Sequence, residues 1–184
     1  MSVPQAIPPI RIVIVDNDFA ETGTIKTWLE KDMRVPWRMT HCVSVEEACP
    51  RINKADLVIL KPEMQGLSSP KEVFKHIDKM VFEVPIIVLT SEGDERGLST
   101  YVMEQGAADT LIRGYFARLV DAIEFALIRQ KIKIDVRKAN DKTLLDSEDK
   151  GAADLKTSQD DALAGDERHR QILRMFSGDY AVDH

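Results

Sequence analysis

The strongest constraint on this chain is a run of four apolar residues, Leu57 to Leu60, which follows Asp56 and stops at Lys61. A short apolar run that breaks abruptly into charge, proline and glycine is typical of a strand buried on both faces of a sheet. In an open α/β sheet, ligands bind in the crevice beyond the carboxyl ends of the strands. We therefore expect Lys61 to lie at the centre of the functional site.

Further strand and helix patterns alternate along the chain. Strands are expected at 10–15, 37–42, 85–90 and 110–113, and helices at 19–33, 93–105 and 116–138, with two more that begin after Ser44 and Ser69. Both serines have a glutamate three positions later, which is the capping-box spacing of a helix start. Pro50 should stop or bend the second helix. The alternation predicts an α/β fold.

Three strand ends resemble those of the bacterial response-regulator receiver domain. The third-strand run resembles the receiver sequence through Leu57–Leu60, Met64 and Gly66, but Gln65 replaces a proline and Lys61 stands where the phospho-accepting aspartate should be. Residues 106–116 resemble the receiver run Gly-Ala-x-x-Tyr-x-x-Lys-Pro-Phe. The resemblance covers about residues 10 to 130. It implies a flavodoxin-like, doubly wound, five-stranded parallel sheet with an extended last helix.

The resemblance also implies a degenerate receiver pocket. Its five positions come from strand ends and loops far apart in the sequence: Asp16, Asn17, Lys61, Thr90 and Arg113. Asp16 and Asn17 stand at the magnesium-binding acids, Arg113 at the phosphate-binding lysine, and Thr110 at the aromatic switch residue. Because a carboxylate is lost at Asn17 and an ammonium is gained at Lys61, we expect no bound metal, no cofactor and no catalytic residue. We expect Lys61 to pair with Asp16 instead.

The function implied is that of a phosphorylation-independent pseudo-receiver, not an enzyme, which acts as an adaptor or decoy in two-component phosphorelay signalling. Its partner would be a histidine kinase, another receiver or an effector, and a homodimer through the last helix is a further expectation. Two alternatives stay open. One is phosphotransfer to a displaced acceptor such as Asp18, Glu63 or Ser91, and the other is binding of a small anion by Lys61 and Arg113.

Outside the domain expected at 10–138, the chain changes character. Residues 1–9 form a proline-rich lead-in, and residues 139–167 read as an acidic flexible linker, since they have few large apolar residues. Residues 168–184 contain a short amphipathic patch with Ile172, Leu173, Met175 and Phe176. This patch is either a partner-binding motif or a disordered end with a chance apolar cluster.

Charge and composition exclude several classes of protein. The net charge of −6 and the pI near 5.3 argue against nucleic-acid binding, which depends on clustered Lys and Arg. No run reaches the roughly 18 apolar residues of a membrane span. Cys42 and Cys49 lack metal-ligand spacing and suit a reducing compartment. We therefore expect a cytoplasmic protein.

Overall fold

Five parallel strands form the centre of the molecule, in the order β2-β1-β3-β4-β5. The computed structural model describes residues 8–64, 69–81, 83–93 and 95–147. Its strands are β1 (Ile10–Val15), β2 (Trp37–Cys42), β3 (Leu57–Leu60), β4 (Ile86–Thr90) and β5 (Asp109–Ile112). Its helices are α1 (Phe19–Asp32), α2 (Val45–Ile52), α3 (Pro70–Met80), α4 (Glu95–Glu104) and α5 (Leu119–Ser147). The predicted five-stranded, doubly wound α/β fold is confirmed.

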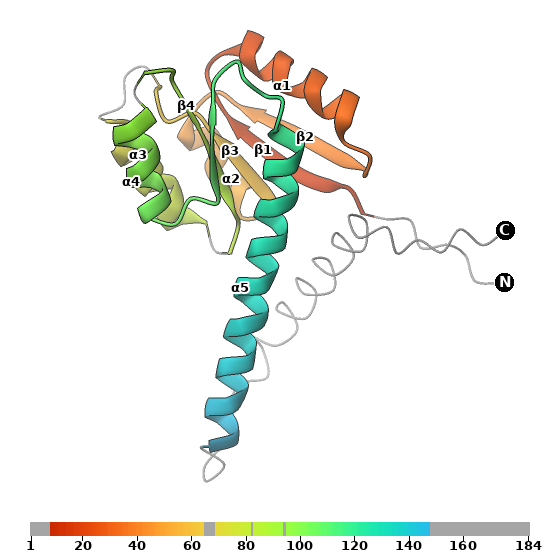
Figure 1. The fold of residues 1–184 in the computed structure, drawn as a ribbon, viewed down its shortest axis with the longest axis vertical. Coiled ribbons are helices and arrows are strands. Elements are labelled where there is room, and N and C mark those ends of the chain that lie inside the picture. The colour runs from red at the N-terminus through yellow and green to blue at the C-terminus, as the bar shows by residue number, and fades with distance from the viewer. Residues whose placement is uncertain (1–7, 65–68, 82, 94, 148–184) are drawn as a thin grey trace, which may run out of the picture.

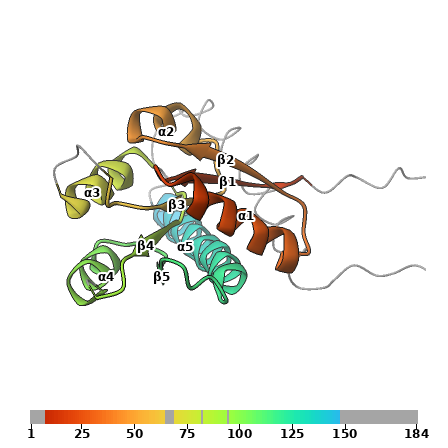
Figure 2. The ribbon, with the colours of Figure 1, turned by 90° about the horizontal axis from the view of Figure 1, so that it is seen from above.

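Helices cover both faces of the sheet, as Figure 2 shows from above. Alternate residues of the strands face opposite sides, so each strand contributes to two cores. Ile12, Ile59 and Leu89 belong to the core under α1 and α5. The neighbouring residues Val13, Val58 and Val88 belong to the core under α2, α3 and α4. Burial on both faces explains why the central strands are almost wholly apolar.

Local capping signals position the helices as their sequences indicate. Ser69 and Glu72 form a complete capping box at α3, with the Glu72 amide donating to Ser69 Oγ at 3.3 Å and the Ser69 amide donating to Glu72 Oε2 at 3.0 Å. The Ser44 hydroxyl caps α2 by accepting from the Glu47 amide. Pro50 lies inside α2, which ends shortly afterwards at Ile52.

The bounds of two elements near the carboxyl end, β5 and α5, differ from those predicted. β5 ends at Ile112, so Arg113 follows the strand instead of closing it. α5 begins at Leu119 rather than at residue 116 and continues past 138 to Ser147, so residues 139–147 are helical and not part of a flexible linker. This stretch contains no glycine or proline, and nothing in its sequence stops a helix.

The last helix leaves the body of the molecule, as Figure 1 shows. Its buried residues run from Leu119 to Leu127, and from there to residue 141 its side chains are half-buried or exposed. Among the described residues, no helix is long and apolar enough to cross a membrane. The proline-rich residues 1–7 and the amphipathic residues 168–184, including Ile172, Leu173, Met175 and Phe176, lie outside the described part of the chain.

Candidate functional site

The carboxyl ends of three strands carry the charged residues of the site. Asp16 follows β1, Lys61 follows β3 and Arg113 follows β5. The Lys61 amide donates to the Val15 carbonyl at 2.9 Å, so the pairing of β1 with β3 sets Lys61 beside Asp16. The Arg113 amide donates to the Thr90 carbonyl at 2.9 Å, which fixes the start of the next loop against β4. The sheet therefore gathers residues that are far apart in the sequence.

Lys61 and Asp16 form a buried ion pair. Lys61 Nζ lies 3.1 Å from Asp16 Oδ1, and the two side chains are 7% and 0% exposed. The Asp18 amide also donates to Asp16 Oδ1, at 2.8 Å. Within the described part of the chain, Asp16 Oδ2 is buried without a hydrogen-bond partner. The Lys61 ammonium is thus the main compensation for a carboxylate held away from water.

Glu21, in the first turn of α1, joins the two cations of the site. Its Oε2 accepts a hydrogen bond from Arg113 Nε at 2.8 Å and lies 3.8 Å from Lys61 Nζ. Only 8% of its side chain is exposed. Sequence reasoning missed this residue. The signal that could have found it is topological, because the first turn of a helix that follows a strand end faces the same edge of the sheet.

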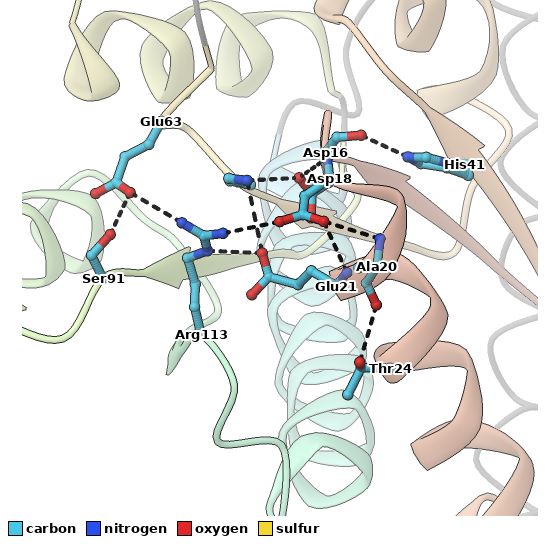
Figure 3. Close-up of polar contacts among 10 residues, drawn as sticks. Asp16, Asp18, Ala20, Glu21, Thr24, His41, Glu63, Ser91 and Arg113 are labelled. Carbon is cyan, nitrogen blue, oxygen red and sulfur yellow. Dashed lines mark hydrogen bonds and ion pairs between the residues drawn. The ribbon is translucent and has the colours of Figure 1, made fainter.

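Two further carboxylates complete what we call the charged cluster, namely Asp16, Asp18, Glu21, Lys61, Glu63 and Arg113. Arg113 NH2 lies 3.6 Å from Asp18 Oδ2, and Arg113 NH1 lies 3.7 Å from Glu63 Oε2. Ser91 Oγ donates a hydrogen bond to the same Glu63 oxygen. Figure 3 shows Asp18, Glu21 and Glu63 around the guanidinium of Arg113. Four carboxylates surround two cations, so the cluster is net negative.

Three of the predicted positions lie outside this network. Asn17 is exposed, and no described contact joins its side chain to the charged cluster. Thr90 is 1% exposed and donates from Oγ1 to the Leu111 carbonyl at 3.4 Å, so its hydroxyl is engaged with β5. Thr110 is half-buried on β5. The structure therefore brings Asp16, Lys61 and Arg113 together directly, and Thr90 only through its backbone.

His41 supports the turn after β1. Its Nε2 donates to the Asp16 carbonyl at 2.6 Å, and its ring meets Phe19 edge-on, with centroids 4.9 Å apart. These contacts tie β2 to the start of α1 and help to hold the Asp16 backbone. His41 therefore acts as a strand-face residue that positions the turn.

The pKa values of two acids in the cluster, Glu21 and Asp18, are shifted in opposite directions. Burial raises the pKa of Glu21, and the neighbouring Asp16 charge adds to this, although the hydrogen bond from Arg113 acts against it. The pKa of Asp18 is lowered, chiefly because its carboxylate caps α1 by accepting from the Glu21 amide. The cluster thus holds one acid that resists ionisation beside one that favours it.

The residues present do not fit a magnesium ion. Mg²⁺ requires several oxygen ligands in near-octahedral geometry. Here an ammonium lies 3.1 Å from the Asp16 carboxylate, and the next residue, Asn17, is exposed. A cation brought to this point would face Lys61 at close range.

No family model matches the sequence, and no curated protein sequence matches it. Solved structures do match. An adenylate cyclase from Rhodopirellula baltica has a TM-score of 0.60 and 22% identity, over 73% of this chain and 99% of that chain. A response regulator receiver domain protein from Clostridium thermocellum has a TM-score of 0.57 and 26% identity, over 67% of this chain and 98% of that chain. NtrX from Brucella abortus, in complex with ATP, has a TM-score of 0.61 and 21% identity, over 71% of this chain and 29% of that chain.

Each of these matches spans at least two thirds of this chain, at a TM-score between 0.57 and 0.61. The chain therefore has the fold of response-regulator receiver domains. This fold is generally that of a signalling module.

Proposed function

We propose that the chain is a phosphorylation-independent pseudo-receiver, which acts as a protein-interaction module, an adaptor or decoy, in two-component signalling. The observation that carries this proposal is the ion pair between Lys61 Nζ and Asp16 Oδ1, 3.1 Å long and almost fully buried. A receiver needs an acceptor carboxylate at the end of β3 and a metal to neutralise the transferring charge. The end of β3 here carries a cation, and the acid beside it is already paired.

Charge pairing also argues for a single fixed conformation. Lys61 contacts Asp16 and Glu21, and Arg113 contacts Asp18, Glu21 and Glu63. A phosphorylation switch needs a bistable element that the modification biases. With Thr110 at the aromatic position, the side chain that would move is a small one. The output would then be a permanent docking surface.

Exposed apolar side chains on α4, before α5 and on α5 suit such a surface. Met103 on α4, Tyr115 before α5 and Phe125 on α5 are 46%, 62% and 53% exposed. The partner would be a histidine kinase, another receiver or an effector protein. A pulldown that compares the full-length chain with one ended after Lys138 tests whether the surface on the domain is sufficient.

The direct test is phosphorylation by small-molecule donors. The chain is incubated with acetyl phosphate and Mg²⁺, then analysed by intact mass and Phos-tag mobility. Beryllofluoride, which mimics a phosphoryl group without transferring one, is titrated separately with and without Mg²⁺ in a calorimetric binding assay. We expect no adduct and no metal-dependent binding, while a receiver domain that keeps its acceptor aspartate reacts in parallel. A stoichiometric acyl phosphate, or binding of beryllofluoride that requires Mg²⁺, would contradict the proposal.

A second candidate, a displaced acceptor, gains some support from one contact. Ser91 donates to Glu63, and Glu63 lies near Arg113, so a hydroxyl, a carboxylate and a cation share one corner of the cluster. If an adduct forms, Ser91→Ala, Glu63→Gln and Asp18→Asn locate it. Anion sensing is less well supported, because both cations already contact carboxylates and the cluster is net negative.

A further inference from the structure

α5 exposes three large apolar side chains that its own domain does not cover. Phe125, Ile132 and Val136 are 53%, 57% and 55% exposed. They are seven and four positions apart, so they lie within about 40° of the helix circumference. We call these three residues the apolar stripe.

The stripe lies on the β5 side of the helix, next to the face that packs on the sheet. Arg129 shares its side of α5, and Arg118, the residue before α5, contacts β5 as well. Arg118 NH2 donates to Asp109 Oδ2 at 2.7 Å, and Arg129 NH2 donates to the Ala108 carbonyl at 2.6 Å, both at the start of β5. The core residues of α5, such as Ile123 and Leu127, point to the sheet instead. The stripe thus continues along the half of α5 beyond Leu127. Figure 1 shows that this half of the helix extends away from the sheet.

After Leu127, the described contacts between α5 and the body of the domain include the exposed ion pair of Arg137 with Glu83, 3.1 Å long, and such pairs contribute little stability. Most helical stability in proteins comes from burying an apolar face rather than from local propensity. After Leu127 the described side chains of α5 are half-buried or exposed. A segment that covers the stripe would supply the missing burial.

Two segments could cover the stripe, namely a second copy of the chain or the chain's own tail, and the charge around the stripe distinguishes them. Residues 128–138 carry five cations and one acid, Asp135. A second copy packed through the same surface would bring these cations together, which is unfavourable. Residues 148–167 of the same chain carry seven acids and two lysines, so they complement this part of α5. The charge pattern favours the chain's own tail.

The length of the tail is sufficient for it to return. Twenty-four residues, 148–171, separate Ser147 from Ile172. A flexible chain of that length has a root-mean-square span of about 27 Å. The distance back along the helix from Ser147 to Ile132 is about 23 Å. Tethering at this range gives a millimolar effective concentration, so even weak docking is populated.

We propose that the apolar patch of residues 172–176 docks on the apolar stripe of the same chain, with the acidic residues 148–167 along the basic part of α5. Ile172, Leu173 and Phe176 have the spacing of one helical face and would supply the apolar contacts. A partner that uses the stripe must then displace the tail. This inference does not depend on the pseudo-receiver proposal.

Hydrogen exchange of the full-length protein, followed by mass spectrometry, tests the docking. In Phe176→Asp, residues 125–139 should exchange roughly tenfold faster, which corresponds to about 1.4 kcal/mol of lost protection. The matched control, Tyr180→Asp, places the same charge outside the apolar patch and should change nothing. The reciprocal variant, Ile132→Asp, should speed exchange of residues 168–176 and leave that of residues 10–90 unchanged, which shows that the sheet is intact.

Two outcomes overturn the inference. One is equal exchange of residues 125–139 in the wild type and Phe176→Asp. The other is a loss of this protection on dilution, at the same concentration at which sedimentation shows a dimer dissociating into monomers. A second copy of the chain would then cover the stripe. Protection that is independent of concentration and weakens with added salt supports intramolecular docking.

Discussion

At the scale of single residues, the pair of Lys61 and Asp16 decides the chemistry of the site. Burying two charges costs several kcal/mol for each ion, and their mutual attraction offsets this only when the geometry is good. Asp16 is fully buried and has one oxygen without a hydrogen-bond partner among the described residues. The pair is therefore less a source of stability than a constraint, because removing either partner leaves the other buried without its nearest counterion.

Removing Lys61 should for this reason destabilise the protein strongly. We expect Lys61→Ala to lower the free energy of unfolding by about 3 kcal/mol, since breaking a buried pair leaves an uncompensated charge. The matched control is Lys26→Ala, at an exposed pair with Glu30 3.6 Å away, which should cost less than about 1 kcal/mol. Urea unfolding measures both. If Lys61→Ala lost no more stability than Lys26→Ala, Lys61 would not be the counterion of Asp16.

Glu21 makes the stability depend on pH in a defined direction. Burial raises its pKa in the folded state above the ordinary value of 4.5. The folded state then holds this proton more tightly than the unfolded chain, so the contribution of Glu21 to stability is largest below 4.5 and is lost as the pH rises through the folded pKa.

Glu21→Gln replaces this group with a neutral one and should remove the dependence. We expect the stability of the variant relative to the wild type to rise as the pH increases from about 4.5 toward 7. Urea midpoints of both proteins over this range provide the measurement. If the difference in stability between Glu21→Gln and the wild type stays constant over this pH range, or shifts in favour of the wild type as the pH rises, Glu21 is not the group responsible.

At the scale of elements, α1 and α5 each combine a structural role with a role in a possible functional surface. Asp18 is the N-cap of α1 and also contacts Arg113, so one residue both starts the helix and belongs to the charged cluster. α5 combines two functions in one helix. Its first part completes the core, and its second part carries the exposed apolar stripe.

This division predicts where the chain can be shortened. A chain ended after Lys138 should keep its free energy of unfolding within about 1 kcal/mol, because the last buried residue of α5 up to residue 141 is Leu127. A chain ended after Phe125 loses Ala126 and Leu127, both 0% exposed, and should lose about 3 kcal/mol or more. Guanidinium unfolding compares the three lengths. If the chain ended after Lys138 lost several kcal/mol of its free energy of unfolding, residues beyond Leu127 would contribute to the core.

At the scale of the whole molecule, the strand order creates the site. β1 has β2 on one side and β3 on the other, so the chain reverses direction of winding beside β1. Loops diverge at such a point and leave room beyond the carboxyl ends of the strands. The charged cluster occupies this place, with Asp16 from β1, Lys61 from β3 and Arg113 from β5.

The positions of most helices and strands, and the centre of the site, could be predicted from local sequence patterns. Apolar runs, capping serines and the helix-ending Gly106, which has a φ of 107°, are local signals that physical chemistry reads directly. The expected pair of Lys61 and Asp16 followed from two strand ends at one edge of the sheet.

Only the tertiary structure decided which side chains complete the site. Glu21 and Glu63 became partners of Arg113 because a helix start and a loop converge there, and no spacing along the chain encodes that approach. The continuation of α5 past residue 138, by contrast, needs no tertiary contact, since residues 139–147 contain no glycine or proline that would stop the helix. Neighbours in space set the charge balance of the site, and the order of strands in the sheet sets the neighbours.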